Sequence, residues 1–131
     1  MTNQHEITKR MPLLNREGNL TEPGWARGLL WDYHRPDIRA SGMRIKEWDY
    51  YFVSNGHIGL ALTIADNGYM GLDSVSYLDF DEKWEITKSP MRLLPMGKTA
   101  LPETSAAGSS EIARGGYALA FYHDDDGTRK L

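Results

Sequence analysis

Two carboxylates stand two positions apart in the segment RIKEWDYY, at residues 44–51. On a β-strand, Glu47 and Asp49 would project from the same face, roughly 6.5–7 Å apart along the strand. Carboxylates at this separation can divide the roles of general acid and general base, as in glycosidases, when burial drives their pKa values apart. The alternative is structural, because carboxylates on strands commonly pair with Arg or Lys of an adjacent strand. Burial would distinguish these two interpretations.

A third carboxylate, Asp66, ends an apolar stretch and begins the sequence Asp66-Asn67-Gly68. As chemistry, it is a candidate general base at the mouth of a barrel. As structure, Asp and Asn stabilise a turn through side-chain hydrogen bonds to the backbone, and Gly68 supplies a positive φ. The turn interpretation is favoured. An enzyme hypothesis would use three candidate catalytic residues, Glu47, Asp49 and Asp66.

Aromatic side chains form the second group of candidates, because the chain carries four Trp and seven Tyr. Such amphipathic rings line pockets for apolar or sugar ligands, although they also fill β cores. The candidate ligand-binding residues are Trp31, Trp48, Tyr50 and Tyr69. Large apolar residues also alternate with small ones over residues 57–65, which favours a cavity or a close neighbour on the small-residue face. That face consists of Gly59, Ala61, Thr63 and Ala65.

Other chemistry finds little support in the sequence. The histidines His5, His34, His57 and His123 lack partners at the spacing of a simple metal site. The absence of cysteine excludes disulfides, thiolate metal sites and cysteine nucleophiles. Phosphate-binding loops, dinucleotide-binding fingerprints and GxSxG nucleophile elbows are absent from the sequence as well. We therefore predict neither a metal site nor a cofactor.

The overall composition is that of one ordinary folded domain. Of 131 residues, 40% are hydrophobic and 25% are charged, which argues against disorder. The formal net charge of -3 leaves no basic surplus for nucleic acid or an anionic membrane surface, although a local patch can escape this average. No stretch approaches the roughly 18 apolar residues of a membrane span, and a signal-peptide core is missing. We predict a cytoplasmic protein.

The elements that must hold the candidate residues are β-strands. Residues 44–53 are rich in aromatic and β-branched side chains, and the Asn55-Gly56 that follows is the strongest short hairpin signal. Further strands are predicted over residues 57–65, 69–80, 84–89 and 115–123, with turns at 66–68, 81–83 and 124–127. Four strands in immediate succession indicate an antiparallel meander.

The C-terminal third is interpreted as a long loop, a strand and a turn. Residues 89–114 include three prolines, and loops of this length in compact domains are usually functional or mobile. After the turn at 124–127, four residues remain for the partner of the preceding strand. We therefore expect the N-terminal part of a larger β protein, with an open sheet edge near Gly115–His123 that invites self-association.

These patterns predict an all-β fold in two parts. Residues 1–42 form an aromatic-rich lead-in segment, and residues 43–131 form an antiparallel β-sheet domain with a long loop at about 89–114. We expect the domain to be an antiparallel meander, part of a lipocalin-like barrel or sandwich, and incomplete at its C-terminus.

Several long segments resemble one protein family. Residues 44–71, RIKEWDYYFVSNGHIGLALTIADNGYMG, together with SVSYLDF, KSPMRLLPMGK and LPETS further along, are similar to the domain-of-unknown-function 2804 family. The resemblance implies a longer protein with this chain as its N-terminal part, and it implies no activity. A looser likeness is to paired lipocalin-like barrels, the hydroxyneurosporene synthase-like and tocopherol cyclase-like proteins, which handle isoprenoids.

Three functions follow as hypotheses. The leading one is a binding module for an apolar or isoprenoid-like small molecule, because of the aromatic residues, the small-residue face and the architectural likeness. The second is an enzyme that acts on such a ligand or on a glycan by carboxylate acid and base chemistry. The third is a purely structural or interaction domain. Nucleic acid is not expected as a partner.

Overall fold

The computed structural model describes residues 4–124 and 126–131, and it is all-β with two larger antiparallel sheets, as the sequence predicts. These described residues contain ten strands and one short 3-10 helix. The chain divides into two compact units, unit 1 over Met1–Ala40 and unit 2 over Ser41–Leu131. The division lies two residues before the one predicted from the sequence.

Unit 1 is mostly irregular, because its sequence has no sustained alternation of apolar and polar residues. Strands β1 (Met11–Pro12) and β2 (Trp31–Asp32) form a short parallel pair. The 3-10 helix η1 spans Arg35–Asp37, where Pro36 has the fixed φ that suits a helix start. Ile7 is fully buried within this part of the chain.

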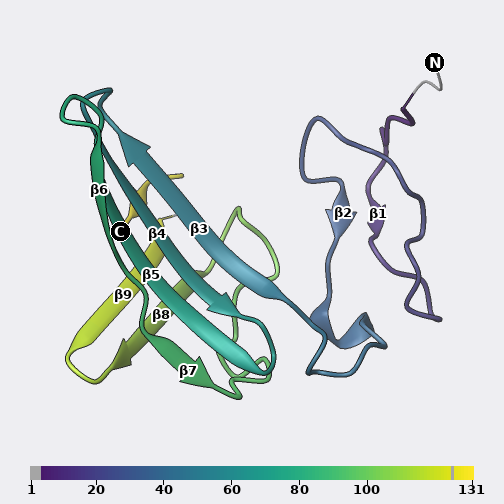
Figure 1. Ribbon diagram of the computed structural model, residues 1–131. Helices are drawn as coiled ribbons and strands as arrows, with labels where there is room; N and C mark the ends of the chain where they lie inside the picture. Colours follow the sequence, from purple (N-terminus) through teal and green to yellow (C-terminus); the bar gives the residue numbers. More distant parts are fainter. Residues whose placement is uncertain (1–3, 125) are drawn as a thin grey trace. The chain divides into compact units, whose positions relative to one another are not determined.

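The main sheet of unit 2 is the predicted meander (Figure 1). Its antiparallel strands follow the chain order, β3 (Glu47–Ser54), β4 (Ile58–Asp66), β5 (Met70–Asp79) and β6 (Trp84–Lys88). A short strand, β7 (Met91–Leu93), pairs with the beginning of β5. The register places residues of opposite parity on opposite faces, so that each strand has one face toward the core and one outer face.

The two first turns of this sheet form as their local sequences predict. Asn55 Oδ1 accepts the backbone N–H of Ile58 at 2.9 Å, and Gly56 has a φ of 92°. Asp66 Oδ1 accepts the N–H of Gly68 at 3.0 Å, and Gly68 has a φ of 75°. The structural interpretation of Asp66 as a turn residue is therefore confirmed.

A second antiparallel sheet has the strand order β10-β9-β8. Its strands are β8 (Ser109–Arg114), β9 (Tyr117–His123) and β10 (Arg129–Lys130). The central strand β9 pairs with β8 over Tyr117–Tyr122 and with β10 at Tyr122 and His123. The edge that the sequence predicts to be open near Gly115–His123 is thus covered on one side by β8 and over two residues by β10.

Two strands lie inside the segment 89–114, which the sequence predicts to be a long loop. β7 and β8 begin and end this segment, and residues 94–108 between them are irregular. β7 is short because Pro90 and Pro95 bound it and cannot donate ladder hydrogen bonds. β8, with the sequence SSEIAR, has a single large apolar residue, so its alternation was not visible in the sequence.

The core lies between the two sheets of unit 2. Leu62 and Ile64 of β4 and Phe121 of β9 are its buried centre. Partly buried side chains packed against them are Tyr51, Val75, Leu101, Ile112 and Leu119. The large-residue face of β4 therefore meets the core, as predicted, although Ile58 and Leu60 at its beginning are 40% and 37% exposed. Within the described residues, the sheets form an open sandwich without barrel closure.

Candidate functional site

The candidate site is an open pocket of about 590 Å³ in unit 2, beside the β3–β4 hairpin. Five of its lining side chains are apolar or aromatic, namely Val53, Ile58, Leu60, Tyr77 and Leu131. The others are Ser54, Asn55, Gly59 and Arg129. A largely apolar lining with a few polar groups, and a volume between about 300 and 1,000 Å³, is typical of small-molecule sites.

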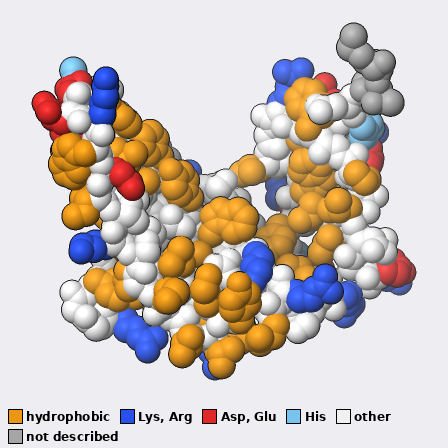
Figure 2. All heavy atoms as spheres, viewed as in Figure 1, with side chains coloured by type: hydrophobic (Ala, Val, Ile, Leu, Met, Phe, Trp, Pro, Cys, Tyr) orange, Lys and Arg blue, Asp and Glu red, His pale blue; other side chains and the backbone are white. Residues whose placement is uncertain are grey.

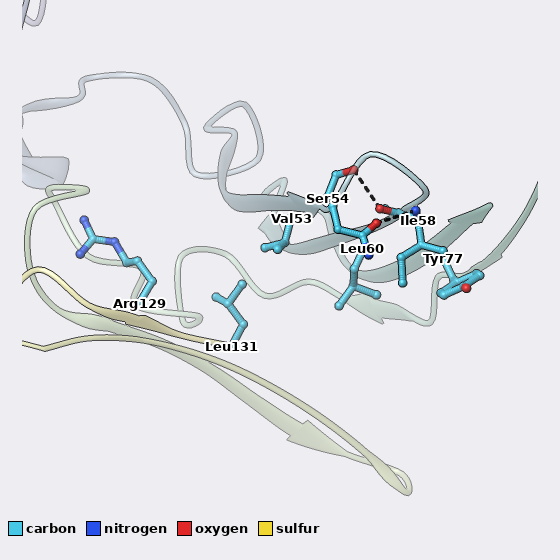
Figure 3. Close-up of a pocket in the computed structure, with 9 residues that line it drawn as sticks. Val53, Ser54, Ile58, Leu60, Tyr77, Arg129 and Leu131 are labelled. Atoms are coloured by element: carbon cyan, nitrogen blue, oxygen red, sulfur yellow. Dashed lines mark hydrogen bonds between the residues drawn. The ribbon is translucent and has the colours of Figure 1, made fainter. Parts of the chain in front are cut away.

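The register of the main sheet builds one wall of the pocket. Val53, Leu60 and Tyr77 lie side by side across three strands, because Leu60 of β4 pairs with Val53 of β3 and with Tyr77 of β5. The opposite wall comes from β10 and the residue after it. Figure 3 shows Leu131 across the pocket from Val53 and Leu60. The pocket is thus the uncovered continuation of the space between the two sheets.

Arg129 supplies the cationic group at this pocket. Its guanidinium donates hydrogen bonds to the backbone carbonyls of Gly127 at 3.2 Å and Ser105 at 2.9 Å. Figure 3 shows the guanidinium turned away from Tyr77. Burial and then the charge of Asp49 raise the pKa of Tyr51, and the positive charge of Arg129 acts in the opposite direction.

Beyond Arg129, polar side chains of β3 meet those of the second sheet. The Ser110 hydroxyl donates a hydrogen bond to Asp49, and the Tyr51 hydroxyl bonds to Nε2 of His123. His123 Nδ1 is buried without a hydrogen-bond partner in the described part of the chain. Sequence analysis missed Ser110 and His123 as site residues. His123 continues the alternation of Leu119 and Phe121 by two residues, and this was the available signal.

A separate buried network holds the irregular segment after β7 against the sheet. Arg92 binds both carboxylate oxygens of Asp73, with Nε at 2.7 Å and Nη2 at 2.9 Å. The Tyr117 hydroxyl also donates to Asp73, at 2.8 Å. Asp66 accepts the Gly97 backbone N–H at 2.7 Å and the Thr99 hydroxyl at 3.0 Å. Each of these two carboxylates accepts hydrogen bonds from several donors, as is typical of buried charges with a structural role.

None of the three predicted catalytic carboxylates lines the pocket. Glu47 and Asp66 are register partners at the end of β3 and β4 that lies away from the hairpin, and Asp49 follows on the same face. Asp49 accepts a hydrogen bond from the Ser110 hydroxyl, and Asp66 accepts one from the backbone N–H of Gly97. The structure thus brings the three carboxylates to one end of the sheet, whereas the pocket lies at the hairpin end of the same strands.

The four predicted ligand-binding aromatics lie elsewhere too. Trp48 and Tyr50 are on the outer face of β3, 62% and 54% exposed. Tyr69 lies in the turn before β5, with the Lys46 ammonium 4.0 Å from its ring centre, and Trp31 belongs to unit 1. The small-residue face also points outward, and a side chain at Gly59 would come within 2.8 Å of the Phe52 ring. The absence of a side chain at Gly59 therefore accommodates the Phe52 ring.

The described residues contain no cluster of three or more His, Cys, Asp or Glu side chains that could hold a metal ion. Across the same part of the chain, no helix is both long and apolar enough to cross a membrane.

Comparison with known protein families yields a match over nearly the whole chain. The model of a domain of unknown function, DUF2804, matches residues 4–131. No curated protein matches the chain significantly, and no solved structure does.

Proposed function

We propose that this chain, which belongs to the family of the domain of unknown function DUF2804, binds an apolar small molecule between the two sheets of unit 2. The observation that carries the proposal is the pocket beside the β3–β4 hairpin. Val53, Ile58 and Leu60 are 54%, 40% and 37% exposed there, on the face that forms the core further along the strands.

An apolar ligand would continue the core into this space. Each Å² of apolar surface that the ligand removes from water contributes roughly 25 cal/mol, so a molecule that covers several of these side chains gains substantial affinity. Among the described residues, the polar groups of the lining come from Ser54, Asn55, Arg129 and the Tyr77 hydroxyl. This composition supports a ligand with a long apolar body and at most a small polar group, such as an isoprenoid.

The architecture supports the same function. We propose that the open sandwich is part of a lipocalin-like barrel, in which inward-facing side chains of antiparallel strands enclose one small ligand. An enzyme that uses Glu47, Asp49 and Asp66 is less well supported, because these carboxylates do not line the pocket and Asp49 and Asp66 already accept hydrogen bonds.

The test is equilibrium binding of all-trans-retinol, a fluorescent isoprenoid alcohol, to the full chain. We expect saturable binding that weakens at least tenfold in Leu60→Gln, because this change places an amide in the apolar wall. Leu20→Gln is the matched control, since Leu20 is an exposed leucine of unit 1 and should leave the affinity unchanged.

Extraction of lipids from the purified protein, followed by mass spectrometry, provides an independent measurement. An apolar molecule enriched with the parent protein and depleted with Leu60→Gln supports the proposal. Empty extracts together with no retinol binding, or equal affinities for the parent and Leu60→Gln, would contradict it.

A further inference from the structure

An exposed apolar surface lies at the end of unit 2 away from the β3–β4 hairpin. Leu93 is 85% exposed and Met91 is 70% exposed, which are the largest values among the exposed large hydrophobic residues of the described chain. The surface, here called the β7 patch, consists of Met43, Tyr69, Met91, Leu93, Leu94 and Met96. Figure 2 shows hydrophobic side chains gathered at this lower edge of the molecule, with Lys and Arg side chains among them.

Hydrogen bonds bring three chain segments together in the patch. The Leu94 N–H donates to the Tyr69 carbonyl at 3.0 Å, and the Met96 N–H donates to the Gly68 carbonyl at 3.1 Å. The Lys46 ammonium donates to the Asn67 carbonyl at 2.7 Å. Residues 42–46, 67–72 and 91–100 therefore form one continuous surface within unit 2.

The conformation of the patch is held in place. Leu94 and Met96 have positive φ angles of 50° and 53°, an unfavourable region for side chains of this kind. Asp66 fixes the segment by accepting the Gly97 N–H and the Thr99 hydroxyl. The apolar side chains thus project from a backbone segment that hydrogen bonds hold to the sheet, although burying them would be favourable.

The three segments that form the patch carry basic side chains and no acidic ones, with Glu47 directly after the first segment. The basic side chains are Arg44, Lys46, Arg92 and Lys98. Arg92 is buried against Asp73, which leaves the other three cations at the surface. The patch is therefore a local basic area in a chain whose formal net charge is -3.

We propose that the β7 patch docks on an anionic lipid membrane surface. Leu93, Leu94 and Met91 would enter the boundary between head groups and acyl chains, while the three surface cations contact lipid phosphates. A second copy of the chain fits less well, because a symmetric interface would bring the cations of both copies together. The inference rests on different residues from the proposed pocket and goes beyond it.

The test is cosedimentation of the full chain with vesicles of pure phosphatidylcholine and of a three-to-one mixture of phosphatidylcholine and phosphatidylglycerol. We expect binding to the mixed vesicles, weaker binding to the neutral ones, and release as salt increases. The double variant Leu93→Ser/Leu94→Ser should bind the mixed vesicles at least tenfold more weakly. The variant Arg44→Gln/Lys98→Gln should lose most of the preference for anionic lipid.

Leu20→Ser/Leu29→Ser is the matched control, because both leucines are exposed and belong to unit 1. It should bind vesicles like the parent, and circular dichroism should show that every variant is folded. Leu60→Gln should also keep vesicle binding, which separates this proposal from the pocket. The proposal is wrong if the parent does not bind anionic vesicles or if the control loses binding to the same extent. It is also wrong if the only effect of Leu93→Ser/Leu94→Ser is the dissociation of a dimer, measured by sedimentation velocity.

Discussion

At the scale of single residues, buried polar groups decide how the two sheets and the segment between them fit together. The side chains of Arg92 and Asp73 are 7% and 0% exposed, and their two parallel hydrogen bonds use the planar fork of the guanidinium. Arg92 Nη2 also donates to the Ala65 carbonyl at 3.1 Å. Both charges are removed from water. If one of them were deleted, the other would lose the opposite charge that offsets its lost hydration.

Asp73→Asn should therefore destabilise unit 2 strongly. Breaking a buried ion pair by removing one charge costs about 3–5 kcal/mol, since the remaining charge stays buried. The measurement is the free energy of unfolding in urea. Asp32→Asn is the control, because Asp32 pairs with Arg10 on the surface and should matter little. Equal effects of the two changes would show that the buried pair contributes no more than a surface pair.

Two tyrosines predict the response to alkaline pH. Burial raises the pKa of Tyr51 above its ordinary value, and Asp49 raises it further. Burial and the hydrogen bond to Asp73 likewise raise the pKa of Tyr117. Above pH 10, the unfolded chain ionises these hydroxyls before the folded protein does, so the free energy of unfolding should fall as pH rises. Below pH 10, these groups should cause no change.

The experiment is urea unfolding between pH 8 and pH 11.5 in the parent, Tyr51→Phe and Tyr50→Phe. Tyr51→Phe should reduce the alkaline decline, because it removes one of the two hydroxyls. Tyr50→Phe deletes the same group from an exposed position on the same strand. A decline that is identical in all three proteins would contradict the assignment of the effect to Tyr51.

At the scale of elements, the turns set the register of the main sheet, and the irregular segment after β7 contributes side chains to the β7 patch. The turns at Gly56 and Gly68 both need a positive φ, but their surroundings differ. A side chain at Gly56 would meet open space, whereas one at Gly68 would come within 2.2 Å of the Gly42 carbonyl oxygen. Close backbone approach, in addition to φ, therefore explains the glycine at position 68.

Gly56→Ala and Gly68→Ala make a matched pair that separates the two effects. Gly56→Ala should cost about 1 kcal/mol of unfolding free energy, because alanine is strained at positive φ. Gly68→Ala should cost more, since the backbone near Gly42 also has to move. The comparison uses urea unfolding of both variants. Equal losses would mean that the contact with Gly42 is relieved at no cost.

At the scale of the whole molecule, both proposed sites belong to unit 2. The pocket lies beside the β3–β4 hairpin, and the β7 patch lies near the turn between β4 and β5, at the other end of the same strands. The core residues Leu62, Ile64 and Phe121 and the Arg92–Asp73 pair are also within this unit. Unit 2 thus contains the core and the buried ion pair of its own sheets.

Residues 41–131 alone should therefore fold. We expect a β-type circular dichroism spectrum, one cooperative thermal transition and retinol binding equal to that of the full chain. A disordered spectrum would show that unit 2 needs unit 1 in order to fold. Loss of retinol binding in a folded unit 2 would show that the pocket depends on unit 1.

The sequence alone determined the fold class, four strands of the main sheet, β9 and the turns at 55–56, 66–68 and 81–83, because alternation and turn residues act over a few neighbouring positions. The predicted turn at 124–127 includes residue 125, which lies outside the described residues. Tertiary structure alone decided the partners of the polar side chains. Ser110 reaches Asp49 only when the two sheets pack, and Arg92 reaches Asp73 only when β7 pairs with β5. The pocket likewise needs Leu131 opposite Leu60. Such contacts join residues far apart in the chain, and no local pattern encodes which face of one sheet meets which face of another.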